Sequence, residues 1–133
     1  MRIVSGLLKG KKLEFLKSPT TRPLRDFVKE NIFNIINHSS LISVKLEQAS
    51  VLDLYSGIGS FGIECISRGV KLVTFIENNN KALTILKKNI NNLKIEKQSE
   101  VFSEKTTSFF NRKKNIEKFD IIFLDPPFAE NFF

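Results

Sequence analysis

The feature that most constrains the fold of this chain is an alternation of short apolar runs with amphipathic segments after residue 48. The predicted strands are 49–54, 72–76, 100–102 and 119–124, and the predicted helices between them are 60–68, 80–92 and 106–110. Strand–helix–strand units of this length connect parallel strands, so the pattern predicts a three-layer α/β fold with one parallel sheet and helices on both faces. Ligands of such sheets bind at the carboxyl ends of the strands.

The first 37 residues differ from the rest in charge. Residues 1–30 carry eight basic and three acidic side chains, a net +5, whereas the remaining 103 carry 13 basic and 11 acidic ones, a net +2. Apolar stretches and glycines over 2–16 predict a basic β-hairpin, and helical spacing predicts a helix from Leu24 to about Asn37. A basic arm is typical of a protein that binds nucleic acid, although a lysine-rich surface without a function has the same pattern. The candidate phosphate contacts are Arg2, Lys9, Lys11, Lys12, Arg22 and Arg25.

Length and composition exclude several classes of protein. With 133 residues, a net charge of +7 and 41% hydrophobic residues, residues 1–133 suit a single domain with 1–37 as its arm and helix, and not a disordered tail. The sequence has neither an apolar run of membrane-spanning length nor the apolar core of a signal peptide, so we expect a cytoplasmic protein without membrane contact. One cysteine excludes a disulfide framework and a multi-thiolate zinc site, and no metal is expected.

A glycine-rich loop follows the first predicted strand. Gly57, Gly59 and Gly62 have the spacing G-x-G-x-x-G, a weak signal that nicotinamide and flavin enzymes share. Glycines here let the backbone turn tightly and approach a ligand in front of a helix N-terminus. Asp53 ends the preceding strand, where a carboxylate disfavours a pyrophosphate and favours a cationic amino-acid ligand. A glycine turn capped by Asp53, without any ligand, is the structural alternative.

Two further strand ends carry candidate functional groups. Glu77 lies about 20 residues beyond the glycines, where an acidic side chain accepts both hydroxyls of a ribose. The tetrapeptide Asp125-Pro126-Pro127-Phe128 follows the fourth predicted strand. Its prolines fix the backbone, so the Asp125 side chain and the Pro126 carbonyl form two acceptors for one exocyclic amine, with Phe128 stacking on the ring. A rigid turn with a buried Phe is the alternative. The functional interpretation requires the first and fourth strands to lie side by side.

Together the three motifs resemble those of class I S-adenosylmethionine-dependent methyltransferases with a D/N-P-P-F/Y tetrapeptide. N-terminal motifs narrow this to a resemblance to the bacterial small-subunit (16S) ribosomal RNA guanine-N2 methyltransferase family (RsmD-like). They are Arg2–Gly6, Gly10–Leu13, Thr21–Pro23, Asp26, Lys29-Glu30 and Phe33-Asn34. The resemblance runs from residue 2 to about residue 128. It implies a Rossmann-like class I methyltransferase sheet, of which this chain holds the first four strands. We therefore expect the chain that ends at Phe133 to be a shortened form of such a methyltransferase.

The resemblance also implies roles for individual residues. S-adenosyl-L-methionine is the implied cofactor, and Asn78 lies beside its adenine. Its methionine portion is bound by Asp53, Ser56, Gly57, Gly59 and Ser60, its ribose by Glu77, and the target guanine by Asp125, Pro126 and Phe128. The implied partner is ribosomal RNA or the assembling small subunit, bound by a monomer. A polar residue that touches the adenine after the third strand has no clear counterpart here, although Glu104 is a candidate.

Other functions stay open on the sequence. An N6-adenine DNA or a protein-glutamine methyltransferase uses a related tetrapeptide, but is not expected to carry this arm. A non-catalytic RNA-binding relic of the family is a second alternative, and a nicotinamide-dependent oxidoreductase is a third, resting on the glycines alone. His38 is expected in a polar loop and Cys65 in the core, both without a catalytic role.

Overall fold

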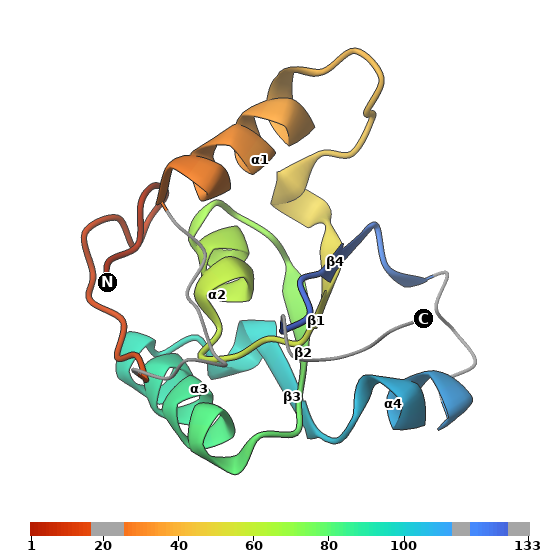
Figure 1. The fold of residues 1–133 in the computed structure, drawn as a ribbon. Coiled ribbons are helices and arrows are strands. Elements are labelled where there is room, and N and C mark those ends of the chain that lie inside the picture. Colours follow the sequence, from red (N-terminus) through yellow and green to blue (C-terminus); the bar gives the residue numbers. More distant parts are fainter. Residues whose placement is uncertain (17–25, 113–117, 128–133) are drawn as a thin grey trace.

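A four-stranded parallel sheet forms the centre of the molecule (Figure 1). The computed structural model describes residues 1–16, 26–112 and 118–127. The strands are β1 (Ser50–Leu54), β2 (Leu72–Glu77), β3 (Ser99–Ser103) and β4 (Ile121–Leu124). Their order is β3-β2-β1-β4, and all three pairings are parallel. The predicted parallel α/β sheet is therefore confirmed, and β1 and β4 lie side by side as the motifs required.

The helices cover the two faces of the sheet. The helices α2 (Ser60–Ser67) and α3 (Asn80–Leu93) lie on one face with α1 (Asp26–His38) beside α2, and α4 (Thr106–Arg112) covers the other face (Figure 1). Alternation along β1 explains the division, because successive side chains point to opposite faces. Val51 packs into the core under α2 and α3, and Leu52 packs against Phe109 of α4.

The element boundaries agree closely with those expected from the sequence. Each described α-helix and β-strand lies within two residues of its predicted bounds, although the predicted start of the first helix at Leu24 lies outside the described residues. Cys65 is buried as expected. Two short 3₁₀ helices, η1 (Leu46–Gln48) and η2 (Glu96–Gln98), were not predicted. His38 ends α1 and does not lie in the loop after it, which corrects the expectation for that residue. None of the helices in the described ranges has the length and hydropathy needed to cross a bilayer.

The N-terminal arm packs against the carboxyl end of α2. A single antiparallel bridge, Arg2 with Lys12, joins the two sides of the arm, where the sequence predicted a β-hairpin over 2–16. Gly6 has φ +88°, and a Cβ placed on it would lie 2.0 Å from the Ser67 carbonyl oxygen. Ser67 also donates its hydroxyl to the Ser5 carbonyl at 2.6 Å and accepts from the Leu8 N–H at 2.9 Å. The close approach of the arm to α2 thus requires glycine at position 6.

Candidate active site

The neighbouring strands β1 and β4 bring two predicted carboxylates to one edge of the sheet. Asp53 is in register with Phe123 and Leu54 with Leu124, and Asp125 follows directly. The charge of Asp125 is near enough to Asp53 to act on its titration, and so is that of Glu77 at the end of β2. These three predicted site residues therefore gather at the carboxyl ends of adjacent strands.

The carboxyl group of Asp53 lies in the interior. Its side chain is 1% exposed, and its Oδ2 accepts a hydrogen bond from the Gly62 N–H at 3.1 Å. Burial raises the pKa of Asp53 from 3.8 to about 8; the Gly62 N–H opposes this, and the charges of Glu77 and Asp125 add to it. Asp53 therefore holds a proton at neutral pH, and a cation bound beside it would lower the pKa again.

Two glycines of the loop that follows β1 have the left-handed backbone conformation. Gly57 has φ +58° and Gly59 has φ +94°, and a Cβ on Gly59 would lie 2.5 Å from Leu86 Cδ1. Tyr55 has φ +55° although it carries a side chain, which is a strained conformation for a bulky residue. The third glycine of the motif has another purpose: a Cβ on Gly62 would lie 2.4 Å from the ring of Phe75. Gly62 thus lets α2 pack closely on β2.

The two serines of the loop differ in their bonding. The Ser56 hydroxyl donates to the Asp53 carbonyl at 2.6 Å and accepts from the Ile76 N–H at 3.0 Å, so it joins the ends of β1 and β2. The Ser60 hydroxyl, in the first turn of α2, is buried and has no hydrogen-bond partner among the described residues. A buried hydroxyl without a partner costs free energy. Ser60 is therefore the serine whose side chain still has hydrogen-bonding capacity for a ligand.

Three backbone N–H groups hold the Glu77 carboxylate at the tip of β2. Its Oε1 accepts from Gly57 at 2.7 Å, and its Oε2 accepts from Asn78 at 3.0 Å and Asn79 at 2.9 Å. A carboxylate has about four lone-pair sites, so further donors can still reach it. Asn78 is exposed beside it.

The remaining predicted residues lie in three places. Asp125 is exposed and Pro126 is half-buried at the end of β4. The cations Arg2, Lys9, Lys11 and Lys12 are exposed on the arm and are not at the strand ends. Phe128, Arg22 and Arg25 lie outside the described residues. Glu104, the candidate adenine contact, forms an ion pair with Arg112 at 2.9 Å. Within the described ranges, no three His, Cys, Asp or Glu side chains gather as metal ligands would.

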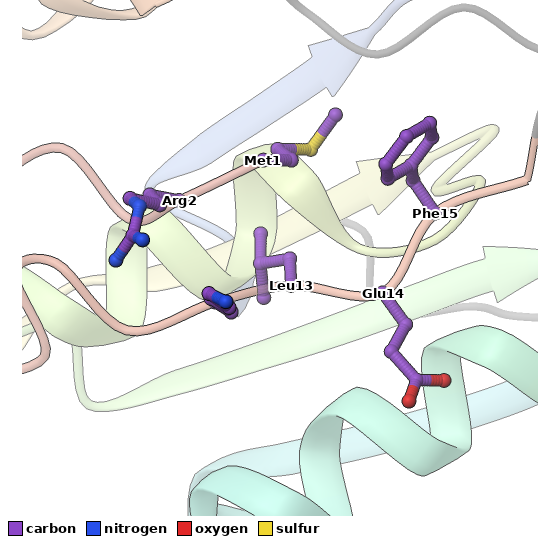
Figure 2. Close-up of a pocket in the computed structure, with 6 residues that line it drawn as sticks. Met1, Arg2, Leu13, Glu14 and Phe15 are labelled. Atoms are coloured by element: carbon purple, nitrogen blue, oxygen red, sulfur yellow. The ribbon is translucent and has the colours of Figure 1, made fainter.

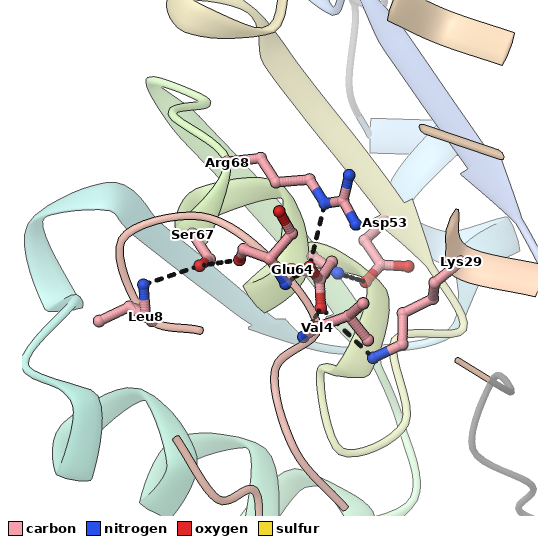
Figure 3. Close-up of polar contacts among 9 residues, drawn as sticks. Val4, Leu8, Lys29, Asp53, Glu64, Ser67 and Arg68 are labelled. Atoms are coloured by element: carbon pink, nitrogen blue, oxygen red, sulfur yellow. Dashed lines mark hydrogen bonds and ion pairs between the residues drawn. The ribbon is translucent and has the colours of Figure 1, made fainter. Parts of the chain in front are cut away.

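Sequence reasoning missed a buried carboxylate that joins the arm to α2 (Figure 3). Glu64 is 0% exposed and accepts from the N–H groups of Val4 at 2.9 Å and Ser5 at 3.0 Å, and from Arg68 Nε at 3.0 Å. Its Oε1 lies 3.6 Å from Lys29 Nζ. The net +5 assigned to residues 1–30 therefore overstates the exposed charge, because Lys29 is buried. The available signal was a Glu–Arg pair four residues apart within the apolar helix.

A second missed residue, Asn89 of α3, connects the arm to the glycine loop. Its side chain is buried, with Nδ2 donating to the carbonyls of Glu14 at 3.0 Å and Ile58 at 3.1 Å. Its Oδ1 accepts from the Glu14 N–H at 2.8 Å. The signal was a polar residue between the buried positions Leu86 and Ile90. Asn89 therefore attaches both the arm and the glycine loop, which is predicted to bind the cofactor, to α3.

Two surface hollows lie away from the carboxyl ends of the strands. One, of about 480 Å³, is lined by the arm (Figure 2). Its lining residues are Met1, Arg2, Lys12, Leu13, Glu14 and Phe15. The other, of about 350 Å³, is lined by Ser43–Lys45, Gln48, Ala49 and Asp120.

Comparisons with known proteins agree with this architecture. The chain is 39% identical over 132 residues to ribosomal RNA small subunit methyltransferase D of Haemophilus influenzae, covering 98% of this chain and 65% of that relative. It is 35% identical over 131 residues to a putative rRNA methyltransferase of Bacillus subtilis, covering 98% of this chain and 68% of the relative. The chain thus spans about two thirds of the length of these relatives.

Solved structures give the same result. A putative methyltransferase of Escherichia coli superimposes with a TM-score of 0.79 at 30% identity, over 97% of this chain and 65% of that one. A putative methylase of Haemophilus influenzae gives 0.73 at 36% identity, over 96% and 64%. A family model described as Conserved hypothetical protein 95 matches residues 1–133. The resemblance seen in the motifs is confirmed, and the chain belongs to this family, that of ribosomal RNA small subunit methyltransferase D.

Proposed function

We propose that this protein is an S-adenosyl-L-methionine-dependent methyltransferase that methylates the exocyclic N2 amine of a guanine in small-subunit ribosomal RNA. The observation that carries the proposal is the pairing of β1 with β4, which brings Asp53 and Asp125 to the same sheet edge. The names of the relatives support ribosomal RNA as the substrate. The choice of guanine N2 rests on the acceptor pair at Asp125 and Pro126 and on the family resemblance.

The side chains at the strand ends fit this cofactor. A cationic amino-acid group suits Asp53, whose buried carboxyl ionises more readily beside a positive charge. The Ser60 hydroxyl, buried without a partner in the described ranges, supports a polar ligand in front of α2. Glu77, oriented by three N–H groups, supports binding of ribose hydroxyls, with Asn78 next to the adenine. When bound, the cofactor supplies an electrophilic methyl group on a sulfonium.

The residues at the end of β4 activate the amine. The lone pair of an exocyclic amine is delocalised into the ring, which makes the nitrogen a poor nucleophile. Hydrogen bonds from its two N–H groups to the Asp125 carboxylate and the Pro126 carbonyl favour a tetrahedral nitrogen and free that lone pair. The negative charge of Asp125 also stabilises the positive charge that develops on nitrogen during attack. Orientation of the two reactants supplies the rest of the acceleration. The part proposed for Phe128, stacking on the base, rests on the resemblance.

The RNA must present the guanine outside a helix. A paired base cannot reach a pocket at the strand ends, so the nucleotide is unpaired or flipped out. The exposed cations of the arm contact phosphates, which positions the RNA without reading its sequence. Ribosomal RNA is modified where small subunits assemble, so the proposal places the protein in the cytoplasm.

A methyl-transfer assay tests the proposal. The protein is incubated with methyl-labelled cofactor and either free ribosomal RNA or small subunits from cells that lack its gene, and the product is mapped by mass spectrometry. We expect one N2-methylguanosine, and a loss of rate of about 100-fold or more for Asp125→Ala. The control is Glu100→Ala, which removes an exposed carboxylate on β3. A product on adenine or protein, or an Asp125→Ala variant as fast as the control, would contradict the proposal.

A further inference from the structure

The hollow on the N-terminal arm combines an apolar wall with two cations (Figure 2). Phe15 is 45% exposed, and Met1 lies beside its ring in the same hollow. Leu13 is buried and forms part of the lining. Exposed aromatic faces next to lysine or arginine are the surfaces on which proteins stack the bases of single-stranded nucleic acid.

The charge of the hollow favours an anionic ligand. Arg2 and Lys12 are both exposed at its edge, and Arg2 donates to the Gly10 carbonyl at 2.9 Å, which fixes the guanidinium on the surface. The one acidic lining residue, Glu14, points toward α3 (Figure 2), where its carboxylate pairs with Lys88 at 3.0 Å. Its charge is therefore offset, and the two cations determine the sign of the potential.

The hollow is also connected to the site at the strand ends. The backbone of Glu14 exchanges two hydrogen bonds with Asn89, and the same Asn89 amide donates to Ile58 in the glycine loop. One buried side chain thus separates the hollow from the loop assigned to the cofactor.

We infer that this hollow binds an unpaired nucleotide of the RNA substrate, with its base stacked on Phe15 and its phosphates against Arg2 and Lys12. The inference rests on the proposed function and adds to it a second, base-contacting site outside the strand ends. A stacked base is recognised by its flat face, so the site prefers single strands to duplexes and has little sequence preference.

Binding of a fluorescein-labelled oligouridine to the full chain, followed by fluorescence anisotropy, tests the inference. Phe15→Leu keeps an apolar side chain but removes the ring, and we expect its affinity to fall about tenfold. Phe15→Tyr should retain the affinity of the parent protein. The matched control is Phe110→Leu, which removes a ring that is 42% exposed on α4 and should leave binding unchanged. On an oligonucleotide with abasic sugars at its centre, the parent protein should bind no better than Phe15→Leu.

The outcomes separate this inference from the proposed function. Equal affinities for Phe15→Leu and Phe110→Leu, or tighter binding of duplex than of single strand, would overturn the nucleotide site while methylation of ribosomal RNA stands. Binding of polyglutamate as tight as that of the oligonucleotide would show that the surface recognises negative charge and does not recognise a base, which would also overturn the nucleotide site. A protein that binds the cofactor but neither binds nor methylates RNA would refute both. Cofactor affinity, measured by calorimetry, should be the same for all the Phe15 variants.

Discussion

At the scale of single residues, the candidate site depends on a carboxyl group placed where water cannot reach it. Asp53 could be predicted at the site because it lies near the end of an apolar run before a glycine loop. Its pKa of about 8 could not, because it depends on complete burial in the folded protein and on the charges of Glu77 and Asp125, which are distant in the sequence. The same holds for the Ser56 hydroxyl, whose partner Ile76 lies 20 residues away.

The raised pKa of Asp53 predicts a loss of stability with rising pH. In the unfolded chain the group titrates near its ordinary value of 3.8, whereas in the folded protein it keeps its proton up to about pH 8. Between these values the native state binds more protons, so the free energy of unfolding decreases as pH rises. Urea unfolding at pH 5 and pH 8 should show this decrease in the parent protein and a smaller one in Asp53→Asn. Identical pH dependence in the two proteins would contradict the buried, protonated carboxyl.

At the scale of elements, α2 connects the glycine loop to the arm. Its first turn carries Ser60 and a later turn carries Glu64, which binds the arm and α1. Arg68, the residue that caps the end of α2, lies over the ring of Phe33 in α1. The extent of each helix and strand could be predicted from periodicity, which is a local property. The contacts of the arm with α2 could not, because they depend on close approach at Gly6 and on a carboxylate inside an apolar helix.

Glu64 is expected to stabilise the attachment of the arm through a buried ion pair. Glu64→Gln leaves the Lys29 ammonium buried without an anion, and should lower the free energy of unfolding by about 3 kcal/mol. Lys29→Met should cost less, because Glu64 keeps Arg68 and two N–H partners. Urea titrations of the single and double variants measure the coupling, which should be favourable. As a control, Glu104→Gln breaks a more exposed pair and should cost about 0.5 kcal/mol. Additive effects of the two substitutions would exclude the coupling.

Asn89 is expected to position the glycine loop. Asn89→Leu removes the donor to the Ile58 carbonyl and should raise the cofactor dissociation constant, measured by calorimetry at a temperature where the variant is fully folded. Asn92→Leu, on an exposed position of the same helix, serves as the matched control and should bind normally. A variant that loses stability but keeps its cofactor affinity would show that Asn89 has only a structural part.

At the scale of the whole molecule, composition predicted a basic protein but not where its charge is exposed. The described arm presents Arg2, Lys9, Lys11 and Lys12 to solvent, whereas Lys29 is buried. The sheet is likewise covered unevenly: on β4, Ile122 is 47% and Leu124 is 60% exposed on the face that α4 covers. The alternation of side chains along the strands identified the two faces of the sheet, but it could not show how much of each face the helices cover.

The distribution of charge predicts the salt dependence of RNA binding. Each phosphate contact on a single strand contributes about 0.7 to the slope of log affinity against log salt. Lys12→Gln should therefore lower the slope by roughly that amount. Lys29→Met should leave it unchanged, as should Lys97→Gln on η2, a control with an exposed lysine away from the arm. Anisotropy titrations over a range of potassium chloride concentrations give these slopes. A slope that fell with Lys29→Met would mean that the buried lysine contacts RNA.

The hydrogen bonds of α2 also limit how this chain can change over generations. An extra residue inserted between Ser60 and Glu64 would advance the rest of the helix by about 1.5 Å and rotate it by about 100°. The Glu64 carboxylate would then face away from Val4 and Ser5, and both of these hydrogen bonds would be lost. Insertions and deletions in this stretch would break all of these contacts at once, so length variation should accumulate in surface segments such as 39–45.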